Sequence, residues 1–164
     1  MRKTKSLIGL TLLSILLSAT LTLAFQNEPD GFRGMGWGTD IALVKNMQLI
    51  KTNPAEAKLY IKSDDSLTIG GATLESIIYG FNPEGKFESV TISLKDYKNF
   101  LALKLDCFKK YGDVEELEDS TGNEEKYLWQ GKTTNIYLTF SRSTNIGILY
   151  SSPGNLGKEE DIFK

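Results

Sequence analysis

Within residues 86–94, a strict alternation of apolar and polar side chains from Ser89 to Leu94 constrains the fold of this chain more than any other feature. Val90, Ile92 and Leu94 occupy every second position, and serine and threonine stand between them. Successive side chains of a β-strand point to opposite faces, so the segment predicts a strand in an antiparallel sheet with one buried face. The preceding Asn82-Pro83-Glu84-Gly85 is typical of a turn and predicts a hairpin with a strand over 75–81.

An amphipathic helix is predicted directly after this strand. Asp96 is a suitable N-cap and Gly112 a suitable C-terminal stop, which places the helix over 97–111. At about 100° per residue, one face collects apolar side chains and should pack on the sheet. These are Tyr97, Phe100, Leu101, Leu105, Phe108 and Tyr111. Lys104 falls inside this stripe, and two interpretations are open. Its stem packs while its ammonium reaches solvent, or it is a buried lysine with a polar partner.

A shorter helix is predicted near the N-terminus of the folded part. Thr39 resembles an N-cap, Asp40 suits the first turn, and apolar residues then follow at helical spacing to about Leu49. Further strands are expected over 58–62, 67–69, 126–130, 134–141 and 145–151, with an acidic loop over 113–125. Together these elements predict an α+β fold: an antiparallel sheet, one long helix on one face, and a shorter N-terminal helix. Two helix-plus-hairpin units are one possible arrangement.

The first 24 residues have the layout of a secretory signal peptide. A basic start is followed by an uncharged apolar run over 7–24, which ends in the small-residue pattern Thr22-Leu23-Ala24. Cleavage there leaves 25–164 as a single domain, large enough to bury a core. The alternative is an uncleaved membrane anchor, but the 18-residue run is shorter than the roughly 20 residues that a spanning helix needs. We therefore expect a periplasmic or extracellular protein.

Composition excludes several function classes. Without the three basic residues of the leader, 16 basic residues stand against 21 acidic ones, which disfavours nucleic acid and anionic lipid as partners. The chain has no histidine, so it cannot build a Ser-His-Asp or Cys-His site or a histidine-ligated metal. Cys107 is the only cysteine and cannot form an internal disulfide. We expect it to be half buried and inert rather than paired with another chain.

No motif in the mature chain carries a readable chemistry, and we expect no cofactor and no metal. The glycine-rich stretch 31–38 is not a phosphate loop, because no strand precedes it and no Gly-Lys-Ser/Thr follows. It is better interpreted as a segment passing close to the fold, with Phe32 and Trp37 tucked beneath it. The acidic segment 118–124 lacks the ligand spacing of an EF-hand. A carboxylate pair could hydrolyse a substrate without histidine, but none lies in a clearly apolar setting.

Aromatic residues are the best candidates for an interaction surface. Tyr79 and Phe81 share one strand face, and Tyr127 and Trp129 share another. If those strands are neighbours, the four rings form one cluster, either as core beneath the helix or as an exposed platform for a peptide or glycan. The opposite face of the sheet, which includes Tyr137, is a further possible docking surface.

The run Phe32-Arg33-Gly34-Met35-Gly36-Trp37-Gly38-Thr39-Asp40 resembles the start of small exported bacterial proteins of uncharacterised function. Tyr79-Gly80-Phe81 before a hairpin and Tyr127-Leu128-Trp129 before the last strands are similar to them too. The order of elements distantly resembles the beta-lactamase-inhibitor-protein and outer-membrane-assembly lipoprotein folds, although the lipidated cysteine is missing. Those folds are binding and assembly modules.

This resemblance implies a non-catalytic binding or interaction module of the bacterial cell envelope, with another envelope protein as its partner. A carboxylate-based hydrolase acting on an envelope polymer is the alternative. A passive structural protein, held at the membrane by an uncleaved signal, is a third.

Overall fold

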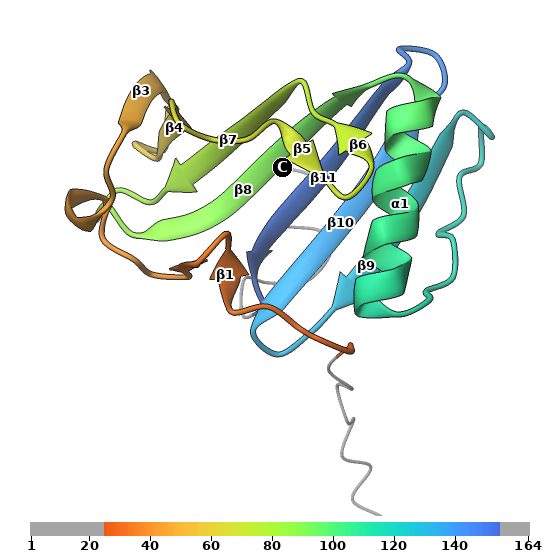
Figure 1. Ribbon diagram of the computed structural model, residues 1–164, viewed down its shortest axis with the longest axis horizontal. Coiled ribbons are helices and arrows are strands. Elements are labelled where there is room, and N and C mark those ends of the chain that lie inside the picture. The colour runs from red at the N-terminus through yellow and green to blue at the C-terminus, as the bar shows by residue number, and fades with distance from the viewer. Residues whose placement is uncertain (1–24, 155–164) are drawn as a thin grey trace, which may run out of the picture.

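The computed structural model describes residues 25–154, so the predicted signal peptide over 1–24 lies outside the described residues. A seven-stranded antiparallel sheet carries a single α-helix on one face (Figure 1). The strand order is β3-β4-β7-β8-β11-β10-β9, and the predicted α+β class is confirmed. Within 25–154, no helix is long and apolar enough to cross a membrane.

The strands of the large sheet include every strand predicted after residue 75. They are β3 (Met47–Thr52), β4 (Lys58–Lys62), β7 (Ser76–Phe81), β8 (Phe87–Lys95), β9 (Glu124–Gln130), β10 (Thr134–Ser141) and β11 (Ile146–Pro153). Two small hairpins were not predicted as such: β1 (Gly31–Phe32) with β2 (Met35–Gly36), and β5 (Thr68–Ile69) with β6 (Ala72–Thr73). Both lie over the face of the sheet that carries the helix α1 (Tyr97–Tyr111) (Figure 1).

The alternation in β8 produces one buried face. Val90, Ile92 and Leu94 are fully buried beneath the helix and hairpins, whereas Thr91 and Ser93 on the other face are half-buried. Ile92 pairs with Ile77 of β7 on one side and with Leu149 of β11 on the other. A continuous apolar floor therefore runs across the middle strands, and it positions everything that packs on it.

Helix α1 begins and ends where the caps predict. The Asp96 carboxylate accepts the backbone N–H of Asn99 at 2.9 Å, and Gly112 follows the last turn with φ 90°. The face that packs on the sheet is rotated from the predicted one. Its fully buried members are Phe100, Leu103 and Cys107. Leu101 and Leu105, predicted to be buried, are exposed.

The physical reason for this rotation is the hairpin β5–β6, which packs along the helix and contributes to its cover. A Cβ at Gly71 would lie 3.9 Å from the Cβ of Ala102, and a Cβ at Gly70 would lie 2.7 Å from the Asp106 Oδ1. The side of α1 that carries Ala102 and Asp106 is therefore covered by a partner from a distant part of the chain.

The predicted N-terminal helix is wrong. Only a single 3₁₀ turn forms, Ile41–Leu43, and Asp40 rather than Thr39 caps it by accepting the N–H of Ala42. Asn46 then adopts φ 64°, and the chain continues as the edge strand β3, paired with β4. A short amphipathic pattern gains little as an isolated helix, whereas the β4 edge offers a full ladder of hydrogen bonds. The described residues thus contain one α-helix, and two helix-plus-hairpin units do not form.

Candidate functional site

The predicted aromatic surface residues lie in the core. Tyr79, Phe81, Tyr127 and Trp129 are between 0% and 3% exposed, which supports the core interpretation and leaves no exposed platform of these four rings. They belong to one hydrophobic core, but the two pairs of rings do not lie on neighbouring strands, because β8, β11 and β10 separate β7 from β9. Tyr137 lies on the opposite face of the sheet and is 7% exposed. These residues stabilise the fold, and the candidate site lies elsewhere.

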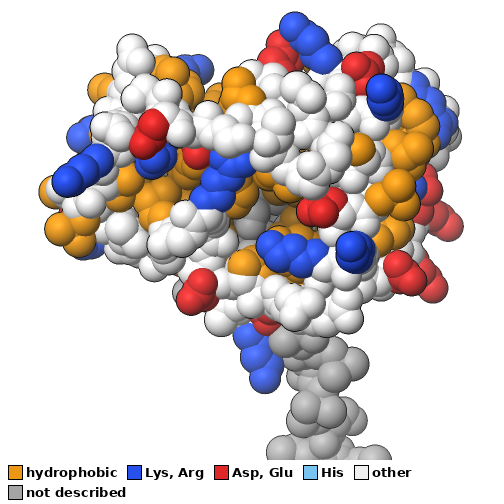
Figure 2. All heavy atoms as spheres, in the orientation of Figure 1, with side chains coloured by type: hydrophobic (Ala, Val, Ile, Leu, Met, Phe, Trp, Pro, Cys, Tyr) orange, Lys and Arg blue, Asp and Glu red, His pale blue; other side chains and the backbone are white. Residues whose placement is uncertain are grey.

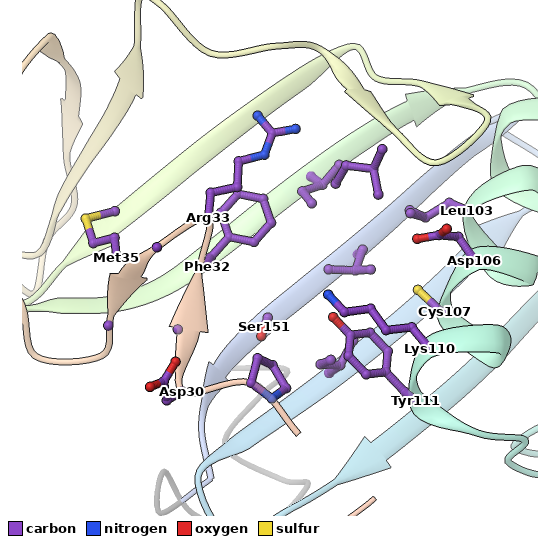
Figure 3. Close-up of a pocket in the computed structure, with 18 of the residues that line it drawn as sticks. Asp30, Phe32, Arg33, Met35, Leu103, Asp106, Cys107, Lys110, Tyr111 and Ser151 are labelled. Carbon is purple, nitrogen blue, oxygen red and sulfur yellow. The ribbon is translucent and has the colours of Figure 1, made fainter. Parts of the chain in front are cut away.

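A cavity of about 650 Å³ lies between the two small hairpins, helix α1 and the buried face of the sheet. Its floor is apolar and comes from three neighbouring strands, through Ile92, Ile136 and Leu149. Figure 2 shows a hollow on this face, with hydrophobic side chains inside it and charged side chains at its edge. Figure 3 shows Phe32 of β1 on one side of the cavity and Asp106, Cys107 and Lys110 of α1 on the other, with Ser151 between them.

Arg33 joins the two hairpins above the cavity. Its guanidinium donates to the Asp65 carboxylate at 2.8 Å and to the backbone carbonyls of Ser66 and Thr68 at 2.8 and 2.9 Å. Asp65 also accepts a hydrogen bond from the buried Tyr79 hydroxyl. Burial, together with this bond to a carboxylate, raises the pKa of Tyr79 well above its usual range. The chain of contacts from Tyr79 through Asp65 to Arg33 anchors the covering hairpins to the core.

The segment before β1 is held by long-range polar contacts. The Glu28 carboxylate accepts the backbone N–H groups of Thr133 and Thr134 at the start of β10. Trp37 stacks on Phe87 with ring centroids 4.8 Å apart and donates its indole N–H to the Thr134 hydroxyl at 2.7 Å. The glycine-rich stretch therefore passes close to the fold with Trp37 beneath it, as predicted from the sequence.

The helix wall of the cavity carries charge. Asp106 and Lys110 both line it, and among residues 25–154 neither forms an ion pair. The Lys110 ammonium lies 4.9 Å from the centroid of the Tyr111 ring. Cys107 also faces the cavity but is only 3% exposed, and burial raises the pKa of its thiol to about 12. The thiol is therefore more deeply buried than the half-buried position expected from the sequence, and it stays protonated.

Lys104 belongs to a separate polar cluster at the other side of the helix. Its ammonium donates to the Tyr127 hydroxyl at 2.5 Å and lies 3.3 Å from the Glu125 carboxylate, so the partnered alternative for this lysine holds. Glu125 in turn accepts from Arg142 at 2.8 Å. Because each of these charges is satisfied by the others, the cluster joins α1 to β9 and offers no free group to a substrate.

The acidic loop is also satisfied from within. The Asp119 carboxylate accepts from the Thr121 hydroxyl and from the backbone N–H groups of Asn123 and Glu124, and these bonds lower the pKa of Asp119 to about 2. Among the described residues, no group of three or more histidine, cysteine, aspartate or glutamate side chains is placed to hold a metal ion.

Sequence reasoning missed the cavity residues Arg33, Asp106 and Lys110 as a set. The only local signal is the i, i+4 spacing of the two charged helix residues, which on its own is typical of any solvated helix face. Their common cavity depends on hairpins whose positions the sequence pattern does not reveal. Comparison of the chain with protein-family models, curated proteins and solved structures gives no match.

Proposed function

We propose that this chain is an exported, non-catalytic binding module of the bacterial cell envelope, and that it binds its ligand in the cavity beneath the two hairpins. The observation that carries the proposal is the cavity itself, about 650 Å³ with an apolar floor and a charged rim. Sites for small ligands are mostly apolar, hold a few placed polar groups, and measure about 300–1,000 Å³.

The cavity has the preorganisation that a binding site needs. Three hydrogen bonds from Arg33 hold the hairpins β1–β2 and β5–β6 together, and Glu28 holds the segment leading into β1. A rim that is ordered before binding reduces the entropy lost when the ligand enters. A protein partner in the envelope would have to present a segment narrow enough to enter this space.

The test uses the uncharged fluorophore N-phenyl-1-naphthylamine and the purified chain 25–164. We expect saturable fluorescence enhancement, because the floor shelters an apolar ring from water. Ser151→Phe, which adds bulk in the cavity, should weaken binding about tenfold or more, and Ser143→Phe in an exposed turn should not. Thr68→Trp at the rim provides a second blocking variant on an exposed position. Binding that is absent, or unaffected by both blocking variants, would contradict the proposal.

The export half of the proposal has its own test. Mass analysis of the chain recovered from the periplasmic or extracellular fraction should show an N-terminus at Phe25. A chain that still begins at Met1 and fractionates with the membrane would instead support the uncleaved anchor.

One observation favours keeping the second candidate, a carboxylate-based hydrolase acting on an envelope polymer. Asp30 and Asp106 both line the cavity, from the hairpin side and the helix side respectively (Figure 3). Two carboxylates facing one substrate are the minimum equipment for acid–base hydrolysis. If this candidate holds, the chain releases soluble fragments from isolated cell-wall polymer, and both Asp30→Asn and Asp106→Asn abolish the release.

A further inference from the structure

Two opposite charges lie one helical turn apart on the wall of the cavity. Asp106 and Lys110 are separated by four residues of α1, about 6 Å along the helix axis. Both line the cavity, and within the described part of the chain neither has an ion-pair partner. Arg33 also lines the cavity, but Asp65 neutralises its guanidinium.

Local contacts explain why Asp106 and Lys110 do not pair with each other, as residues at this spacing often do. The Asp106 carboxylate is packed against the turn of the hairpin β5–β6, where a Cβ on Gly70 would lie 2.7 Å from its Oδ1. The Lys110 ammonium lies along the Tyr111 ring and interacts with the Tyr111 hydroxyl. Each charged group is thus held apart from the other and remains available to a ligand (Figure 3).

The floor beside these charges is suited to an apolar side chain. Ile92, Ile136 and Leu149 are between 0% and 6% exposed, so they are sheltered from bulk water. Phe32 closes the opposite side of the cavity, in contact with the Tyr79 ring at 5.9 Å between centroids. A ligand that matches the whole site therefore needs a positive group, a negative group about one helical turn away, and an apolar group between or beside them.

We propose that the cavity binds a short zwitterionic peptide, of dipeptide size, with at least one large apolar side chain. Its free amino group contacts the Asp106 carboxylate, its terminal carboxylate contacts the Lys110 ammonium and the Tyr111 hydroxyl, and its apolar side chain rests on the floor. Two residues of extended chain span at most about 7 Å, which suits the spacing of the two charges. The proposal rests on the proposed binding function of the same cavity.

A purely anionic amphiphile fits the site less well. Its head group would meet Lys110 but would leave Asp106 without a partner, and it would lie in the same cavity as Asp30. Like charges in one confined site oppose binding. A fatty acid is therefore the alternative ligand that the experiment must distinguish.

The test compares four ligands in calorimetric titrations of the chain 25–164: leucyl-phenylalanine, its N-acetyl derivative, its C-terminal amide and the fatty acid dodecanoate. We expect each blocked peptide to bind about tenfold or more weakly than the free dipeptide, because each loses one charge-assisted contact. Lys110→Met should remove the difference in affinity between the free dipeptide and its amide. Asp106→Asn should remove the difference in affinity between the free dipeptide and its acetylated derivative. Lys109→Met, an exposed neighbour of Lys110 that is not part of the cavity lining, is the matched control and should retain both.

Equal affinity for the three peptides, no measurable peptide binding, or discrimination that survives both variants would overturn the proposal. Tighter binding of dodecanoate than of the dipeptide would replace it with an anionic amphiphile. These failures are distinct from failure of the proposed function, because the neutral fluorophore would still bind and would still be excluded by Ser151→Phe.

Discussion

At the scale of single residues, Glu125 is the charge on which the junction of α1 with β9 depends. It is only 4% exposed, and it accepts hydrogen bonds from Arg142, Lys104 and Tyr97. Burial on its own would raise the pKa of this carboxyl, but the hydrogen bonds outweigh burial and hold the pKa below its usual 4.5. A buried charge held by several donors stabilises the fold only as long as all the partners remain.

Glu125→Gln is therefore expected to lower the free energy of unfolding by about 1–3 kcal/mol at pH 7, because Lys104 and Arg142 lose their shared charged partner. The loss is limited because the Arg142 side chain is half exposed to solvent. The matched control is Glu124→Gln, whose carboxylate pairs with Lys126 near the surface and should matter little. Urea denaturation measures the free energy of unfolding of both variants. Equal stability of the two variants would show that the cluster does not stabilise the junction.

At the scale of elements, helix α1 shows how a neighbouring hairpin selects the buried face. Leu103 is 1% exposed and Leu105 is 59% exposed, although both are leucines in the middle of the same helix. Leu103→Ala should cost about 2–5 kcal/mol because it leaves a void in the core, whereas Leu105→Ala should change stability by less than about 0.5 kcal/mol. Thermal or urea unfolding of the two variants decides whether the buried face of α1 is the one that carries Leu103 or the one that periodicity predicts. A larger loss for Leu105→Ala would contradict the observed orientation.

The hairpin β1–β2 allows a test that separates the cavity rim from the core. Gly31 pairs with Gly36 across the hairpin. A Cβ on Gly31 would lie 2.0 Å from the Met35 carbonyl oxygen, so Gly31→Ala forces the two short strands apart. A Cβ on Gly36 meets only the Asp30 carbonyl oxygen at 3.7 Å, an ordinary contact.

We expect Gly31→Ala to abolish binding of N-phenyl-1-naphthylamine and to lower the free energy of unfolding by only about 1 kcal/mol, since the hairpin side chains that pack against the core, Phe32 and Met35, are only partly buried. Gly36→Ala should retain binding. Fluorescence titration together with urea unfolding checks both variants. If Gly31→Ala binds as tightly as the parent chain, the hairpin is not part of the site.

At the scale of the whole molecule, stability should be greatest at intermediate pH. The pKa values of Glu28 and Glu125 are lowered in the folded state, because hydrogen bonds to each carboxylate outweigh its burial. Their stabilisation is present above the unfolded pKa of about 4.5 and is lost as the pH falls through the lower folded pKa. Stability should therefore fall in acid, and the difference between Glu125→Gln and the parent chain should shrink there.

At alkaline pH, stability is lost as the pH rises rather than as it falls. Burial raises the pKa of Cys107 to about 12 and raises the pKa values of Tyr79, Tyr111 and Tyr150 above 10.0. The unfolded chain loses these protons near their ordinary pKa values of 9.0 and 10.0, while the folded chain retains them. Stability is therefore lost as the pH rises above about 9. Urea midpoints from pH 3 to 11 should trace a dome, and a flat profile above pH 9 would contradict the burial of these groups.

Local chemistry was sufficient to predict much of this fold. The alternation over 89–94 determined β8, and Asp96 and Gly112 determined the ends of α1, because strand periodicity and caps act within a few residues. The same reasoning failed at 39–49, where pairing with β4 outweighed a short helical pattern. It also failed for the orientation of α1, because no pattern within the helix reveals the hairpin that packs beside Ala102 and Asp106.

By itself, then, the sequence determined an α+β chain with one buried sheet face and one long helix, and its lack of histidine excluded whole classes of chemistry. Only the tertiary structure decided that the aromatic residues build the core and that a cavity lies beneath two hairpins. The physical reason is range: Arg33 meets Asp65 across 32 residues, and Glu28 meets Thr133 across 105. Contacts between such distant residues leave no periodic signal in the sequence, because they depend on how the finished elements pack.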